Sequence, residues 1–266
     1  RRLGSPLDGL LELRAPGGEL VAWNDDHMVK DGHLHKGMGL LTHHADPRLQ
    51  ARLPDDGVYA VRVTDVTGHG GAGHAYRLRV SAPRPDFRAW VTPAGIAVPR
   101  GRAAPLEVHI LRLDEFDGPV DIRLEDAPRG FRLDGGRVPA GCARMRMTLS
   151  APSRPLPGPT AFRLAARAVV DGKTVTHPVA PAENMMQAFL WRHLAPARQL
   201  MVVTRRARGG PVVRLASDLP LRIPAGGGGE VRVRVPNAPR RDGLQLAVAH
   251  PSAGFSAGGI APAPEG

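Results

Sequence analysis

Residues 54–63 read Pro-Asp-Asp-Gly-Val-Tyr-Ala-Val-Arg-Val, a polar turn followed by an alternating run. Pro, Asp and Gly are favoured in tight turns because they preset or widen the accessible backbone angles. After the turn, a period of two places Tyr59, Val61 and Val63 on one face of an extended chain. The stretch therefore predicts a β-strand with one apolar face.

The same alternation recurs along most of the chain. Near its start, residues 11–14 and 20–23 alternate on either side of Pro16-Gly17-Gly18, which predicts a hairpin. Further strands are predicted at residues 48–53, 75–80, 87–91, 106–113, 120–124, 143–149, 161–170, 199–204, 212–215, 219–223, 231–235 and 244–248.

Short strands at roughly ten-residue spacing, separated by turn residues, are typical of β-sandwiches of the immunoglobulin type. We therefore predict an all-β fold class with tandem β-sandwiches. Residues 182–194 are the exception, because they contain neither Gly nor Pro and could form a short helix. The predicted units are a first sandwich without its opening strands at 1–82, an immunoglobulin-like sandwich at 86–180, a connector at 181–198 and an incomplete second immunoglobulin-like sandwich at 199–266.

The composition agrees with this fold class. The chain has 32 Gly and 27 Pro, which interrupt long helices, and its 42% hydrophobic residues are enough for packed cores. Cys142 is the only cysteine, which excludes an intramolecular disulfide and a cysteine-based zinc site. No apolar run approaches the ~18 residues of a membrane span. The chain opens in mid-pattern without an initiator Met, and we expect it to be a piece of a longer protein.

The net charge of +11 does not indicate a nucleic-acid partner. Residues 1–80 carry ten basic and ten acidic residues, so the whole excess lies further along the chain. Only three of the 36 basic residues are Lys, and the Arg residues mostly alternate singly along strands, as in residues 231–235. A nucleic-acid surface needs clustered basic groups, usually with aromatic residues between them. Here the Arg residues are better explained as solvent-facing positions of strands.

The first unit resembles the bacterial pre-peptidase C-terminal (PPC) domain over about residues 3–81. The order and spacing of five short patterns carry the resemblance: Leu7-Asp8-x-x-Leu11-x-Leu13; Leu20-x-Ala22-x-Asn24-Asp25-Asp26; Asp46-x-x-Leu49; Pro54-x-Asp56-Gly57-x-Tyr59-x-Val61-x-Val63; and Tyr76-x-Leu78-x-Val80. The opening strands of the family are missing. The chain also looks like large exported proteins of planctomycete-like bacteria, in which immunoglobulin-like repeats follow a PPC-like unit, through residues 42–46 and 181–189.

The resemblance implies a non-catalytic β-sandwich that is extracellular, periplasmic or at the cell surface. It also implies attachment to a secreted peptidase or another surface protein. Relatives in collagenases bind calcium and substrate, which suggests where a calcium site would lie here.

The densest group of oxygen ligands is Asn24-Asp25-Asp26, followed by Asp46 beyond a His-rich loop, with Asp8 on the neighbouring strand. Ca²⁺ prefers six to eight oxygen ligands, which carboxylates, an amide and loop carbonyls supply. Residues 24–45 are a long irregular stretch, and a bound cation would help to offset the entropy of ordering it. The alternative is an Asx-type turn with solvated side chains. We take Asp8, Asn24, Asp25, Asp26 and Asp46 as the candidate calcium ligands.

The histidines of the same loop offer a second metal hypothesis, a transition-metal site within residues 24–46 that serves a hydrolase. All the candidates sit on one loop without a His-Glu-x-x-His helix, so solvated histidines are the alternative. The histidines concerned are His27, His33, His35, His43 and His44.

Nothing else in the sequence indicates catalysis. There is no Gly-x-Ser-x-Gly elbow, and the glycines at 226–229 lack the Lys-Ser/Thr ending of a phosphate loop. We therefore predict a binding or accessory region, not an enzyme, whose partner is a polysaccharide, a protein surface or a neighbouring catalytic domain. The alternatives are the metal-dependent hydrolase and a purely structural spacer.

Overall fold

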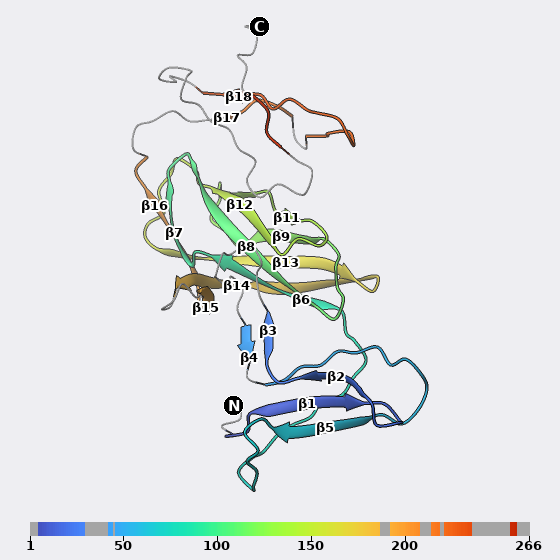
Figure 1. Ribbon diagram of the computed structural model, residues 1–266. Helices are drawn as coiled ribbons and strands as arrows, with labels where there is room; N and C mark the ends of the chain where they lie inside the picture. Colours follow the sequence, from blue (N-terminus) through green and yellow to red (C-terminus); the bar gives the residue numbers. More distant parts are fainter. Residues whose placement is uncertain are drawn as a thin grey trace.

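In a computed structural model, the chain folds into strands, turns and extended segments (Figure 1). The structure describes residues 5–29, 42–44, 46–186, 192–207, 214–218, 221–235 and 256–259. These residues contain no helix, and accordingly none of them belongs to a helix that could cross a membrane. The all-β fold class predicted from the alternation is confirmed.

The first unit is built on a three-stranded antiparallel sheet. Its strands, in the order β2-β1-β5, are β1 (Gly9–Arg14), β2 (Leu20–Asn24) and β5 (Ala60–Asp65). The predicted hairpin joins β1 to β2, and Gly18 takes a positive φ of 93° in its turn, a conformation in which a side chain would be strained. A second antiparallel pair is formed by β3 (His27–Val29) and β4 (Thr42–His44).

Two strands predicted for this unit are wrong. Residues 48–53 and 75–80 run without strand structure. In the second segment Tyr76 is 63% exposed, Leu78 42% and Val80 76%. Alternation gives a segment the side chains of a strand, but only a neighbouring edge supplies the hydrogen bonds that make it one. The pattern alone does not reveal whether such an edge lies within reach.

The central sandwich follows the linker at residues 82–85. Most of its strands fall where the sequence predicts them. They are β6 (Asp86–Thr92), β7 (Gly95–Pro99), β8 (Ala103–Leu113), β9 (Val120–Glu125), β10 (Arg132–Asp134), β11 (Arg137–Val138), β12 (Arg144–Ser150), β13 (Thr160–Val170), β14 (Lys173–Met186), β15 (Arg192–Pro196) and β16 (Leu200–Arg205).

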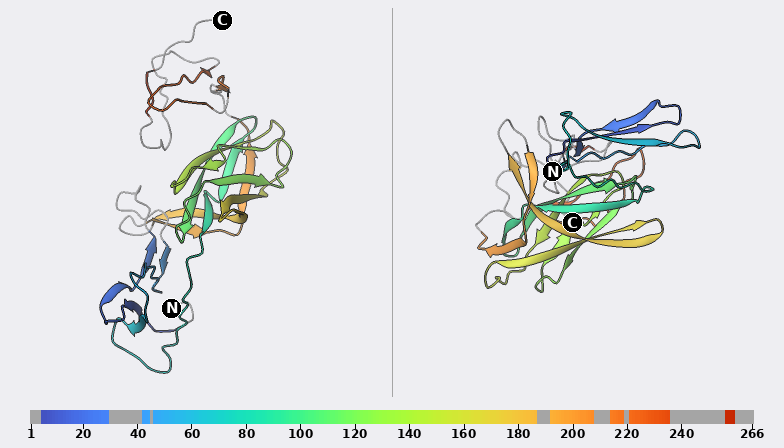
Figure 2. Two further views of the ribbon diagram at one scale, coloured as in Figure 1. Left: turned by 90° about the vertical axis from the view of Figure 1, so that its right-hand side faces the viewer. Right: turned by 90° about the horizontal axis from the view of Figure 1, so that it is seen from below.

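These strands form two layers (Figure 2). One layer has the order β10-β12-β8-β6, and the other contains β11-β9-β13, with β14 and β16 on the far side of β13 and β7 beyond β16. Along the chain, β6, β8, β10 and β12 belong to one layer and β7, β9, β11, β13 and β16 to the other, as in a sandwich of the immunoglobulin type.

Alternating side chains fill the space between the layers. Along β8 the residues Leu106, Val108 and Ile110 are buried, and along β13 the residues Leu164 and Ala166 are. All belong to one apolar cluster that extends over both layers. Ala161, Arg163, Arg167 and Val169 of β13 are exposed, as the predicted period of two requires, whereas Ala165 is buried between Leu164 and Ala166.

The helix predicted at residues 182–194 is wrong. β14 first pairs with β13, crosses to pair with β6 through Val179–Pro181, and then forms a hairpin with β15. Ala182 is fully buried at this crossing, and the Glu183 carboxylate accepts a hydrogen bond from the Ala94 backbone N–H at 3.0 Å. A lack of Gly and Pro permits a helix without requiring one, and here the pairing with distant strands decides the structure.

The segment after residue 199 also differs from the expected start of a third sandwich. β16 pairs with β13 and, in parallel, with β7, so it completes the central sandwich. Beyond it, β17 (Arg214–Leu215) and β18 (Val233–Arg234) form a two-stranded pair. The strand predicted at 219–223 is not formed over its described residues 221–223, and the one predicted at 244–248 lies outside the described residues.

A polar contact joins the first unit to the sandwich. Asp114, with a positive φ of 48°, follows the end of β8 and forms an ion pair with Arg48. The second oxygen of its carboxylate accepts a hydrogen bond at 2.8 Å from the backbone N–H of Arg84 in the linker. Beside it, the Gln50 amide donates to Glu115 at 3.4 Å. One carboxylate thus fixes both the linker and the segment at 48–50.

We predict that Asp114→Ala loosens the first unit from the sandwich. Loss of an exposed ion pair and a backbone hydrogen bond costs ~1–2 kcal/mol, which raises the population of open arrangements roughly 5- to 30-fold. Small-angle X-ray scattering should record a larger radius of gyration.

The matched control is Asp171→Ala, which removes another aspartate with a positive φ of 47°, at the turn between β13 and β14, whose carboxylate forms no ion pair or hydrogen bond with the described residues of the first unit. The two variants share the same backbone strain. An unchanged scattering profile for Asp114→Ala would contradict the role assigned to Asp114.

Candidate functional site

The predicted ligands Asn24, Asp25 and Asp26 form a tight turn at the end of β2. The Asn24 amide donates to the Asp26 carbonyl at 3.0 Å, and its oxygen accepts from the backbone N–H of Arg48 at 2.8 Å. The Asp25 carboxylate accepts from the Asp26 N–H at 2.8 Å. These bonds agree with the alternative of an Asx-type turn, and they engage the one amide oxygen that Asn24 would offer to a cation.

Asp8 lies just before β1. Its N–H donates to the Asp65 carboxylate at 2.9 Å, and its carbonyl accepts from the Val66 N–H at 2.7 Å. Asp8, Asp26 and Asp46 each have interaction partners in addition to these bonds. Within the described ranges, no three His, Cys, Asp or Glu side chains are grouped closely enough to hold a metal ion. Calcium at the predicted ligands therefore stays a prediction.

Of the loop histidines, His27 is the one whose side chain the structure describes. It lies at the start of β3, half-buried, and burial followed by the nearby Arg48 charge lowers its pKa. His43 and His44 lie on β4, opposite Met28 and His27. His33 and His35 lie outside the described residues. The hydrolase hypothesis thus has no geometry in its favour over the described part of the loop.

A buried polar group in the sandwich has the residue types of a catalytic triad but not its geometry. The His109 ring is 2% exposed, and its Nε2 lies 3.2 Å from the Thr92 hydroxyl. The Glu107 carboxylate also approaches Nε2, at 3.7 Å, and forms an ion pair with Arg144 at 3.4 Å. A relay needs the hydroxyl and the carboxylate on opposite ring nitrogens. Here both groups lie at Nε2, so these contacts do not have the geometry of a relay.

Sequence reasoning missed Asp65, which organises the turn after β5. Its carboxylate accepts hydrogen bonds from the Thr67 hydroxyl and from the backbone N–H groups of Thr67, Asp8 and His69. The Thr67 hydroxyl first, and then the backbone donors, hold the pKa of Asp65 well below its ordinary value. The Asp-x-Thr-Gly pattern at 65–68 is a turn signal from which this role could have been predicted.

Asp65 should make the first unit sensitive to acid. Because folding lowers its pKa, the ionised carboxylate adds stability above the unfolded value of 3.8, and this contribution is lost as pH falls below it. Asp65→Asn should therefore unfold more easily than the wild type near neutral pH. The difference should shrink as pH falls below about 3.8.

Urea unfolding measures this difference at a series of pH values, monitored by Trp23 fluorescence with Trp90 and Trp191 replaced by Phe so that a single tryptophan reports on the first unit. Asp56→Asn is the control, since Asp56 is an exposed turn carboxylate to which the described residues donate no hydrogen bond. A constant difference between Asp65→Asn and the wild type at all pH values would contradict the assignment.

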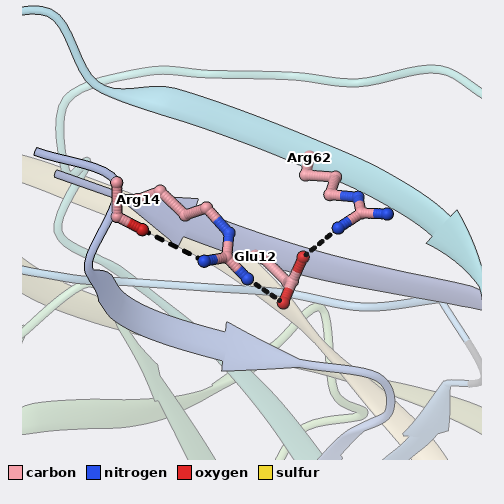
Figure 3. A network of polar contacts seen from close by, with 4 residues as sticks. Glu12, Arg14 and Arg62 are labelled. Carbon is pink, nitrogen blue, oxygen red and sulfur yellow. Dashed lines mark hydrogen bonds and ion pairs between the residues drawn. The ribbon is translucent and has the colours of Figure 1, made fainter. Parts of the chain in front are cut away.

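The outward face of the first sheet carries an ion network. Glu12 on β1 lies between Arg14 and Arg62, and both guanidinium groups point toward its carboxylate (Figure 3). Arg14 is 2.9 Å from Glu12 and also donates to the Gly18 carbonyl at 3.0 Å. Arg62 is 3.6 Å from Glu12, and its side chain is 63% exposed. Two positive charges thus surround one negative charge on this face.

An exposed tryptophan completes this face. Trp23 lies directly opposite Glu12 on β2, as Arg62 does on β5, so all three share one side of the sheet. Trp23 is 59% exposed. We name the surface formed by Glu12, Arg14, Trp23 and Arg62 the Trp23 face. Trp is enriched at binding surfaces because its ring offers a large apolar area and its N–H offers a hydrogen-bond donor.

Comparisons with known proteins identify no family. No family model and no curated protein matches the chain. Among solved structures, the chain is similar to domains 4–9 of the surface layer protein SbsC, with 11% identity over 80% of this chain and a TM-score of 0.27. The match covers 33% of that structure's own chain, so this chain spans about a third of its length. A likeness of this size defines no family. The resemblance to the PPC domain rests on the sequence patterns alone.

Proposed function

We propose that the chain is a non-catalytic binding region of an exported or cell-surface bacterial protein, and that the Trp23 face is its contact surface. The observation that carries the proposal is a contrast in packing. Apolar side chains fill the interior of the sandwich, whereas Trp23 and Arg62 are exposed to solvent on one face of the three-stranded sheet. A sheet face holds its side chains at fixed spacings, which suits recognition without a cleft.

The pattern that resembles the PPC domain supports the same proposal. Its apolar members Leu11, Leu13, Val61 and Val63 are paired across β1 and β5 and share the side of the sheet opposite to the Trp23 face. Leu13 is the buried member of this set, so the resemblance corresponds to the more apolar face of the sheet and leaves the charged face for contacts. Attachment to a secreted peptidase or to another surface protein is part of this proposal, as is a location outside the cytoplasm.

A binding screen tests the proposal against the hydrolase and the spacer. The purified chain, labelled and applied to arrays of glycans, peptides and cell-wall fragments, should bind at least one class of ligand. Trp23→Ala should weaken that binding about tenfold or more, as expected for an exposed aromatic anchor. Binding to no member of the arrays would favour the spacer. Stoichiometric zinc that is lost on replacing His43 and His44 with Ala would favour the hydrolase.

Calcium is a separate part of the proposal. If Asp25 and Asp26 bind Ca²⁺ in the native state, calcium must raise the melting temperature, with ~2.7 kcal/mol gained at a concentration 100 times Kd. A double change of Asp25 and Asp26 to Asn should abolish the shift. The same double change at Asp55 and Asp56, an adjacent pair in an exposed turn, should preserve it. An unchanged melting temperature of the wild type at millimolar calcium would contradict this part.

A further inference from the structure

We infer that the Trp23 face binds an acidic polysaccharide, with the indole stacking on a sugar ring and Arg62 pairing with a carboxylate of the polymer. This inference rests on the proposed function and gives its ligand a chemical class. It depends on three features of the face: the exposed indole, the available guanidinium and the charged centre between them.

The exposed indole provides the apolar platform. The face of an aromatic ring carries partial negative charge, and the C–H groups on one side of a sugar ring carry partial positive charge and little water. Trp23 lies on β2, which is an edge strand of the three-stranded sheet, so a long polymer can pass over it from the side. At 59% exposure, much of the ring is open to contact.

The available guanidinium provides charge selection. In the described part of the chain, the ion pair recorded for Arg62 is the 3.6 Å contact with Glu12, which leaves most of its N–H donors in water. Arg14 is more fully engaged, because its guanidinium bonds both Glu12 and the Gly18 carbonyl. Arg62 is therefore the group that remains to form a two-bond contact with an incoming carboxylate.

The spacing of these two groups suits a chain of sugars. Trp23 and Arg62 both lie opposite Glu12, on the strands either side of β1. Their backbones are thus two strand spacings apart, ~10 Å. This distance is comparable to the length of a disaccharide, so one sugar can stack on Trp23 while the carboxylate of the next reaches Arg62.

The charged centre favours a glycan over a protein partner. A stable protein interface buries ~800 Å² on each side and removes water from its core. Here that core would contain Glu12 with its two arginines, and removing water from such a network is costly. A polysaccharide keeps these groups hydrogen-bonded through its hydroxyls and through trapped water.

Affinity electrophoresis or calorimetry can test this inference with polymers that differ in charge. Three acidic polymers, polygalacturonate, alginate and hyaluronate, serve as probes, and fully methyl-esterified polygalacturonate serves as the uncharged counterpart of the first. We expect binding to at least one acidic polymer. If it is polygalacturonate, esterification should weaken it at least about tenfold. Added salt should weaken binding to any acidic polymer.

Two variants separate the stacking from the charge. Trp23→Ala should weaken binding to the acidic polymer at least about tenfold, and Arg62→Ala about 3- to 10-fold with a smaller dependence on salt. The matched controls are Tyr76→Ala and Arg77→Ala, which remove an exposed aromatic and an exposed arginine from a segment outside the sheet. Both controls should bind like the wild type. An unchanged unfolding midpoint for each variant confirms that it is folded.

Each remaining outcome overturns the inference. These outcomes are binding to none of the three acidic polymers, equal binding to the esterified polymer, and unchanged binding by Trp23→Ala. Binding of a peptide or protein on the arrays that requires Trp23 would replace the glycan with a protein partner and leave the proposed function standing. Failure of every array would instead remove the proposed function itself.

Discussion

The burial of alternate side chains from β8 and β13 is the interaction on which the rest of the structure depends. Leu106 and Ile110 from one layer meet Phe162 and Leu164 from the other in a single apolar cluster. Apolar burial stabilises at ~25 cal/mol per Å², and these two long strands each contribute more side chains to the cluster than any other strand does. The partly buried Arg112 connects the loops next to β8, donating to the carbonyls of Gly118, Pro139 and Cys142.

The first unit is organised differently, because one sheet has no second layer of its own among the described residues. Leu13 is its buried apolar side chain, whereas Val58 is 86% exposed and Val61 40%. Its order depends more on polar contacts: Asp65 fixes the turn after β5, and Asp114 connects segment 48–50 to the sandwich. The packed sandwich therefore supplies most of the buried apolar core, whereas the first sheet keeps more of its side chains in solvent. A binding surface needs such exposed side chains, so we expect it on the first sheet.

Local patterns predicted the local features of this fold. Alternation placed β9, β12 and β13 within a residue or so of their observed ends. The turn between β13 and β14 falls at Asp171-Gly172, an Asp-Gly pair typical of hairpin turns, and both residues have positive φ. Long-range pairing could not be predicted in this way. Residues 75–80 alternate but do not pair with the edge strand of any sheet. β14 changes layers at Val179–Pro181, where it pairs with the edge strand β6.

The same distinction applies to the candidate site. The pairing of Glu12 with Trp23 follows from the register of a predicted hairpin, so it could have been predicted from the sequence. Arg62 is fifty residues beyond Glu12, and only the pairing of β1 with β5 reveals that it joins the same face. The calcium ligands are predicted from residue type, because their side chains carry the oxygen atoms that Ca²⁺ prefers. Three of them, Asn24, Asp25 and Asp26, are held by hydrogen bonds within or near one turn, a geometry that residue type does not specify.

We thus expect a sandwich with a packed apolar interior to carry a binding surface on the separate, three-stranded sheet. Hydrogen–deuterium exchange of the whole chain should be measured with and without the acidic polymer that binds it most tightly. Without polymer, the amides of β8 and β13 should exchange slowest and those of residues 75–80 fastest. With polymer, added protection should be confined to β1, β2 and β5. Protection by the polymer within β8 or β13, or slow exchange at residues 75–80, would contradict the account.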